Sequence, residues 1–132
     1  MSHVVEHWND FENEINLLKK ICSKNSYVYI KFPGIDSLKT GRKSFNIFKD
    51  IHIPHYFYFA SYVFDNIMER NGFMCVFSNA SVKALYLYTG KNQKLVNNYK
   101  KVIHDLFIAE IKRYLYFPKI IIKKIIDKFK FR

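Results

Sequence analysis

The chain has 132 residues and carries 22 Lys and Arg against 11 Asp and Glu, a formal net charge of +11. This length is typical of one domain, and a hydrophobic fraction of 49% supplies a core, which excludes global disorder. The two cysteines form no CxxC motif or disulfide framework, and the longest uncharged run, Ile51 to Phe64, is too short to cross a bilayer. We therefore predict a single intracellular, cytoplasmic domain spanning residues 1–132.

The positive charge is concentrated at the C-terminal end. Residues 91–132 hold twelve Lys or Arg and three acids, a net charge of +9, whereas residues 1–25 have a net charge of −1. A basic block of this kind attracts phosphate, either on nucleic acid or on an anionic membrane. The alternative is a lysine-rich, solvated face with no partner.

The first third of the chain predicts a helix, a strand and a basic loop. Apolar residues at alternating spacings of four and three predict an amphipathic helix over residues 4–22. Residues 26–32 are β-branched and aromatic, which predicts a short strand. Residues 36–43 predict a basic loop, and Ser44 is a candidate cap for a short helix over residues 45–51.

The middle of the chain predicts a helix followed by a β-hairpin. Pro54 suits the first turn of a helix that we expect to continue to Arg70, where Asn-Gly ends it. Two apolar runs, residues 73–77 and 82–88, flank a short polar turn and predict the hairpin. On the predicted helix, we expect seven polar or aromatic residues to face outward: His55, Tyr58, Ser61, Tyr62, Asp65, Asn66 and Glu69.

The C-terminal third predicts two helices. A broad apolar face predicts a long helix over residues 91–117, and Pro118 is expected to break it. Residues 119–132 then predict a short amphipathic helix with six basic residues. This last helix would dock its apolar side on the domain or on a second subunit, follow DNA phosphates, or lie on a membrane surface. We favour docking, because its isoleucines need burial.

The predicted order of helix, strand, two helices, hairpin and helix resembles the winged helix-turn-helix family over residues 4–90. Residues 48–54 are similar to the end of the family's second helix and its turn, residues 60–73 to the third helix running into the first wing strand, and residues 85–89 to the second wing strand. The resemblance implies an α+β fold, a third helix placed in the DNA major groove and a wing on the backbone. It also implies that residues 91–117 form an extra helix used to dimerise.

We therefore predict a small winged-helix-like regulator that is not an enzyme and that binds double-stranded DNA as a homodimer, mainly through phosphates. Cations would supply the affinity, and two tyrosines one helical turn apart, with a nearby asparagine, would supply base contacts. The predicted nucleic-acid-binding residues are Lys39, Arg42, Lys43, Tyr58, Tyr62, Asn66, Lys83, Lys91, Lys94, Lys119, Lys123 and Lys124.

Two other binding functions stay open at this point. A viral or mobile-element module that binds a host protein is favoured by the acid-free aromatic patch over residues 56–62 and by the lack of Lys or Arg on the third helix before Arg70. Peripheral membrane binding would use the basic C-terminal segment. Asp50, His52 and His55 match no specific zinc-site spacing, so we predict no metal and no other cofactor.

Overall fold

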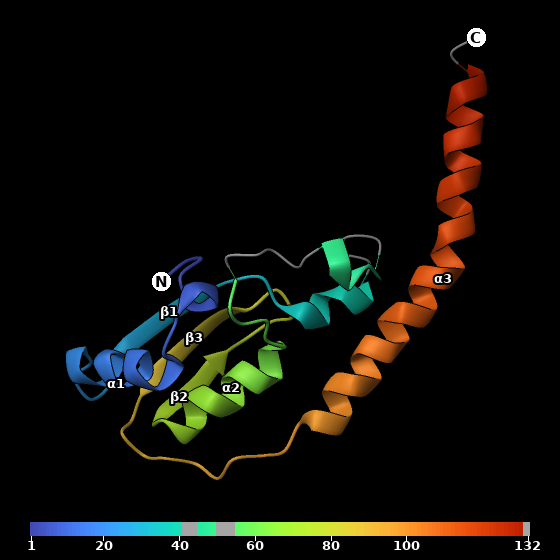
Figure 1. The fold of residues 1–132 in the computed structure, drawn as a ribbon. Coiled ribbons are helices and arrows are strands. Elements are labelled where there is room, and N and C mark those ends of the chain that lie inside the picture. Colours follow the sequence, from blue (N-terminus) through green and yellow to red (C-terminus); the bar gives the residue numbers. More distant parts are fainter. Residues whose placement is uncertain (41–44, 50–54, 131–132) are drawn as a thin grey trace.

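The computed structural model describes residues 1–40, 45–49 and 55–130, without the side chains of residues 120, 121 and 123–130. It is an α+β structure, which confirms the predicted class (Figure 1). Three α-helices accompany a three-stranded sheet: α1 (Phe11–Ile21), α2 (Ser61–Arg70), α3 (Tyr99–Lys130), β1 (Tyr27–Lys31), β2 (Phe73–Phe77) and β3 (Lys83–Tyr88). Short 3₁₀ helices lie at η1 (Val5–His7), η2 (Ile35–Thr40) and η4 (Ile47–Lys49).

The sheet is antiparallel with the strand order β1-β3-β2. The predicted strand and hairpin are thus confirmed, and the hairpin strand β3 lies in the centre, where Tyr29 of β1 pairs with Leu85 and Cys75 of β2 pairs with Tyr86. Side chains alternate along the strands, so Ile30 and Tyr86 point into the core. The sheet therefore presents one apolar face to be covered.

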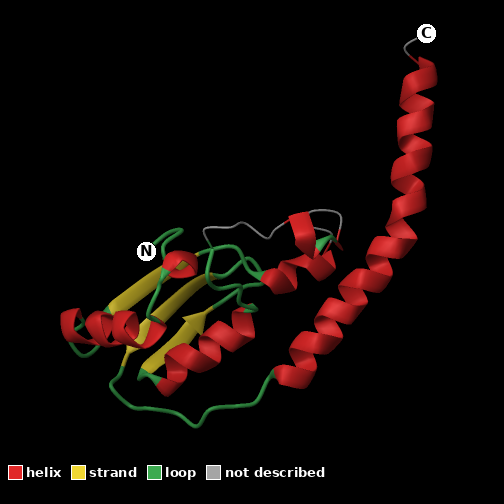
Figure 2. Cartoon of the chain, in the orientation of Figure 1, coloured by secondary structure: helices red, strands yellow, loops and turns green. Residues whose placement is uncertain are grey.

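Helices α1 and α2 lie against this apolar face (Figure 2). Phe64 of α2 is fully buried between the rings of Phe32, at 4.8 Å between centroids, and Tyr86, at 6.1 Å. Phe11, at the start of α1, joins the same aromatic cluster. These rings bury large apolar areas and form the centre of the main core.

The other face of the sheet carries exposed side chains. Tyr27 and Tyr29 of β1 and Met74 and Val76 of β2 are all more than two-fifths exposed. They occupy the strand positions that alternate with the buried ones. Within the described residues, the α-helices cover only the opposite face (Figure 2).

Two predicted helices begin later than expected, one because of a distant hydrogen-bond partner and the other because of a local cap. The predicted helix from Pro54 begins at Ser61, since the amides of Tyr56 and Phe57 donate to the carbonyl of Glu6, at 2.8 and 3.4 Å. These bonds direct the two amides away from a helical pattern, and residues 55–60 are not helical. The predicted helix over residues 4–22 begins at Phe11, where the carboxylate of Asp10 accepts a hydrogen bond from the amide of Asn13, as an N-cap does.

The C-terminal helices also differ from the prediction. Residues 91–98 are not helical, and α3 begins at Tyr99. The predicted break at Pro118 is wrong, because α3 continues through this residue to Lys130 and includes the segment expected to be a separate helix. Proline inside a helix removes a hydrogen bond and bends the axis, and Figure 1 shows α3 bending along its length. In the described part of the chain, no helix combines the length and apolarity needed to cross a membrane.

Candidate nucleic-acid interface

A second apolar cluster fixes the first half of α3 against η2. Ile35 and Leu38 of η2, Ala60 just before α2, and Ala109 of α3 are buried together. Ala109 is small enough for α3 to approach closely, and Leu106 packs beside it, one turn earlier. The sequence folds in this way because Ile35 and Leu38 are three residues apart in η2, so both apolar side chains lie on the same side of this short helix.

A polar network at the edge of this cluster ties three elements together. The Oδ2 atom of Asp105 on α3 accepts hydrogen bonds from the Nζ of Lys39 at 2.9 Å and the hydroxyl of Tyr62 at 3.0 Å. The Nζ of Lys101 lies 3.8 Å from the centroid of the Tyr62 ring, a cation–π contact. Asp105 therefore links η2, α2 and α3.

Electrostatics in this network favour the charged form of Asp105. Burial acts to raise its pKa, but hydrogen bonds from Lys39 and Tyr62 and the charges of Lys39 and Lys101 outweigh burial, so the pKa lies below its ordinary value. The pKa of Tyr62 is raised, first by burial and then by the neighbouring carboxylate. Tyr62 therefore remains a hydrogen-bond donor at neutral pH.

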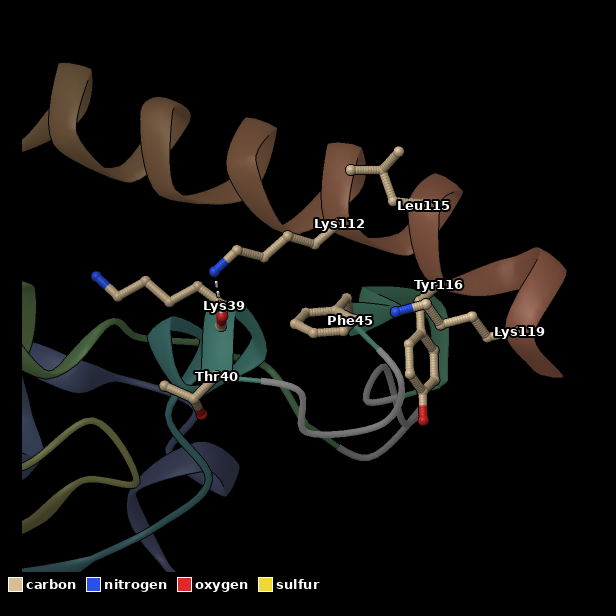
Figure 3. A pocket seen from close by; sticks show the side chains of 7 residues that line it. All are labelled: Lys39, Thr40, Phe45, Lys112, Leu115, Tyr116 and Lys119. Carbon is tan, nitrogen blue, oxygen red and sulfur yellow. Dashed lines mark hydrogen bonds between the residues drawn. The ribbon is translucent and has the colours of Figure 1, made fainter.

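Beside this network an open cleft of about 610 Å³ lies between η2 and α3 (Figure 3). Its walls combine cations with apolar and aromatic side chains: Lys39, Thr40, Phe45, Lys112, Leu115, Tyr116 and Lys119. The Nζ of Lys112 donates to the carbonyl of Lys39 at 2.9 Å, which spans the cleft. The rings of Phe45 and Tyr116 meet edge to face, with 5.6 Å between centroids.

The lining of the cleft suits an anion with an attached flat or apolar group. Among the described residues that line it, three are lysines and none is acidic. Lys39 is paired with Asp105, whereas Lys112 and Lys119 are exposed. Ammonium groups attract phosphate, and aromatic rings in a basic groove can stack on bases.

The structure brings two of the predicted site residues, Lys39 and Lys119, to this one cleft. Sequence reasoning missed Lys112, Phe45 and Tyr116. A signal was present, because Lys112, Tyr116 and Lys119 are spaced by four and three residues and so share one face of a helix. The direction of that face depends on how α3 packs against η2.

The other predicted cations do not gather at the cleft. Lys83 is exposed on β3, while Lys91 and Lys94 lie in the segment between β3 and α3, which runs on the far side of α2 from η2 (Figure 1). Arg42, Lys43 and Ser44 fall outside the described residues. Of the short helix predicted over residues 45–51, the structure describes residues 45–49, which include the 3₁₀ helix η4 and no α-helix. Lys123 and Lys124 lie on α3, but their side chains are not described.

Helix α2 does not present the outward face that the sequence predicted. Tyr58 precedes the helix, so it is not one helical turn from Tyr62 as expected. Tyr62 bonds to Asp105, and the side-chain amide of Asn66 both donates to the carbonyl and accepts from the amide of Val96. The predicted base-contacting residues of α2 thus make contacts within the chain.

Two further residues predicted to face outward also bond inside the molecule. The hydroxyl of Ser61 donates to Asp36 at 2.6 Å, and Asp65 accepts a hydrogen bond from the hydroxyl of Tyr86, which is fully buried. Burial raises the pKa of Asp65 despite this donor. Within α2, Arg70 alone is exposed. The segment between β3 and α3, together with α3 itself, occupies the side of α2 that a groove-binding helix would need.

Comparison of the chain with protein-family models, with curated proteins and with solved structures found no match.

Proposed function

We propose that the protein binds nucleic acid through the cleft between η2 and α3, with backbone phosphates beside Lys112 and Lys119. The observation that carries this proposal is the convergence of lysines from two elements far apart in the sequence, together with two aromatic rings, on one open cleft. Phosphate neutralisation by lysine is the main source of sequence-independent affinity for nucleic acid.

We further propose that the scaffold is winged-helix-like and that the ligand is double-stranded DNA. The strand order β1-β3-β2, with α1 before β1 and with η2 and α2 between β1 and β2, supports this interpretation. In it, α2 takes the place of the family's third helix, and η2 takes the place of the second helix, which the sequence predicts to end within residues 48–54. Because α2 is covered by the C-terminal part of the chain, we assign the DNA contacts to the cleft and not to α2.

The test is a fluorescence anisotropy titration with a labelled duplex of about 20 base pairs at about 50 mM salt. The double variant Lys112→Gln/Lys119→Gln should weaken binding about tenfold or more. The matched control, Lys83→Gln/Lys91→Gln, removes the same charge from two exposed positions away from the cleft and should weaken binding much less. Equal losses in both variants, or no binding by the wild type, would overturn the proposal.

A second arm identifies the surface and the form of nucleic acid. The variant Tyr116→Ala removes a ring from the cleft, and Tyr29→Ala removes an exposed ring from the uncovered face of the sheet. Weaker duplex binding after Tyr116→Ala alone supports the cleft. If only Tyr29→Ala weakened binding, recognition would lie on the uncovered face of the sheet. A clear preference for single strands would indicate recognition by base stacking. Either result would contradict duplex binding through the cleft.

The outer face of α3 favours a second candidate function, association through protein–protein contact. Four large apolar side chains form an exposed stripe, which we call the outer stripe: Ile103, Phe107, Ile111 and Tyr114. Phe107 is 62% exposed and Tyr114 67%. Contiguous exposed apolar surface of this kind marks interaction sites.

We propose a second copy of the chain as the partner of the outer stripe. The spacing of four, four and three residues makes a continuous seam for packing against an identical helix. The seam lies on the opposite side of α3 from Ala109, which packs on η2, so a dimer would leave both clefts open. Two clefts on one duplex would bind with higher avidity than one.

Sedimentation velocity tests the dimer. The wild type should sediment as a dimer at micromolar concentrations, and Phe107→Glu should convert it to a monomer. Ile21→Glu is the matched control, because Ile21 is an apolar residue on α1 with 80% of its side chain exposed. A monomeric wild type, or a dimer unaffected by Phe107→Glu, would contradict this proposal.

A further inference from the structure

Three potential metal ligands meet where η1 faces the segment that precedes α2. The ligand atoms of Glu6, His7 and His55 all lie within 4.8 Å of one another. The ring centroids of His7 and His55 are also 4.8 Å apart, with the planes at 83°. Carboxylate oxygen and imidazole nitrogen are the donors that zinc and related divalent ions prefer.

The backbone holds these ligands together. The amide of Tyr56, next to His55, donates to the carbonyl of Glu6 at 2.8 Å, and the amide of Phe57 donates to the same oxygen at 3.4 Å. These hydrogen bonds connect residues 55–57 to η1 irrespective of any side-chain contact. The cluster is therefore a consequence of the fold and not of surface side chains that meet by chance.

The carboxylate of Glu6 points to a positively charged ligand. Glu6 is only 2% exposed, and its Oε2 atom is buried with no hydrogen-bond partner among the described residues. Its other oxygen, Oε1, lies 3.2 Å from the Nδ1 of His3. Burying half of a carboxylate without a donor is costly, and a coordinated cation would offset this cost.

We propose that Glu6, His7 and His55 bind a divalent transition metal of the zinc class. Two imidazoles and one carboxylate form a ligand set that zinc uses in sites with an open fourth position. Metal–ligand distances of about 2.1 Å require donors about 3.4 Å apart, so the ligand atoms, which lie within 4.8 Å of one another, would move closer together when the metal binds. His3 bonds to the other oxygen of Glu6 and acts as an outer-shell partner that orients the carboxylate.

This site differs from the Asp-x-His-x-x-His pattern in the sequence. The two have only His55 in common, and Asp50 and His52 lie outside the described residues. The bound metal would connect η1 to the segment before α2, and so stabilise the start of the chain. The site shares no residue with the cleft, so its test does not depend on the proposed function.

The experiment uses the full chain without a polyhistidine tag, with Co²⁺ as a spectroscopic probe and Zn²⁺ as a competitor. We expect saturation at about one equivalent, with visible absorption bands that Zn²⁺ abolishes. His7→Gln and His55→Gln should each weaken binding about tenfold or more. His104→Gln is the matched control, because His104 is exposed on α3, and it should bind as the wild type does.

A second measurement separates a built site from binding to surface histidines. Zn²⁺ should raise the thermal unfolding temperature of the wild type, EDTA should reverse the rise, and His55→Gln should abolish it. Circular dichroism confirms that each variant is folded. The proposal fails if the wild type shows no saturable binding, or if His104→Gln lowers affinity as much as His7→Gln does.

Discussion

The Nζ atom of Lys39 lies 2.9 Å from the Oδ2 atom of Asp105, and this ion pair joins η2 to α3 across 66 residues of sequence. Lys39 also lines the cleft. Because its charge is already paired with Asp105, Lys39 stabilises the packing of α3 against η2. The partly buried Asp105 carboxylate has the hydroxyl of Tyr62 as its second donor. Loss of Asp105 would therefore loosen α3 and release Lys39 at the same time.

The first prediction is that Asp105→Asn lowers the free energy of unfolding by about 1–2 kcal/mol at neutral pH. Because the pKa of Asp105 is lowered in the folded state, its contribution is present above the unfolded pKa and is lost as pH falls through the folded value. Urea unfolding of both proteins from about pH 7 to pH 3 measures the difference. The difference should shrink below about pH 4. A difference that does not change with pH would contradict the role of this carboxylate.

A second prediction concerns the pair formed by the buried Tyr86 and the partly buried Asp65. Tyr86→Phe removes the hydroxyl that donates to Asp65 and should destabilise the protein by about 1–3 kcal/mol at pH 7. The pKa of Asp65 is raised by burial, so folding favours its protonated form. The stability that this protonation contributes is lost as the pH rises through the pKa of Asp65 in the folded state.

The cost of Tyr86→Phe should consequently be smaller below about pH 4, where Asp65 is protonated. Denaturant unfolding at two pH values tests this, with the exposed Tyr29→Phe as a control that should change little. Equal costs at both pH values would show that the hydroxyl does not support the charged carboxylate.

The sequence predicts the sheet better than the helices, for a physical reason. Strand alternation and turn residues are local, and they place β1, β2 and β3 within one or two residues of their observed bounds. The start of α2 depends on Glu6, which accepts hydrogen bonds from the amides of Tyr56 and Phe57. No local pattern near Pro54 carries that information.

The cleft was only half predictable for the same reason. The sequence indicated the basic residues Lys39 and Lys119. The helical spacing of Lys112, Tyr116 and Lys119 could also have placed these three residues on one face of a helix. Which face of α3 meets η2 is decided by Ala109 and Asp105, through contacts with residues far away in the sequence. The outward orientation expected for Asn66 was wrong because it bonds to a segment thirty residues later.

A third prediction follows from the hydrogen bonds of Asn66. They hold the segment between β3 and α3 across α2, and Asn66→Ala removes both. Trypsin should then cleave faster after Lys91 and Lys94, which are exposed in this segment, while the free energy of unfolding falls by no more than about 1–2 kcal/mol.

Limited digestion followed by mass spectrometry measures these cleavage rates. Asn66→Asp keeps the acceptor for the amide of Val96 but loses the donor to its carbonyl, so its rate should lie between those of wild type and Asn66→Ala. Unchanged cleavage in the alanine variant would mean that other contacts hold the segment.

The last prediction concerns the salt dependence of duplex binding. If Lys112 and Lys119 each neutralise a phosphate, each contributes about −0.9 to the slope of log K against log salt, because bound lysine releases condensed counterions. The double variant Lys112→Gln/Lys119→Gln should therefore reduce the magnitude of the slope by about 2 units between about 50 and 200 mM salt. Lys83→Gln/Lys91→Gln removes equal charge and should leave the slope nearly unchanged. A variant that binds more weakly but keeps the wild-type slope would mean that these lysines support the shape of the cleft and do not contact phosphate.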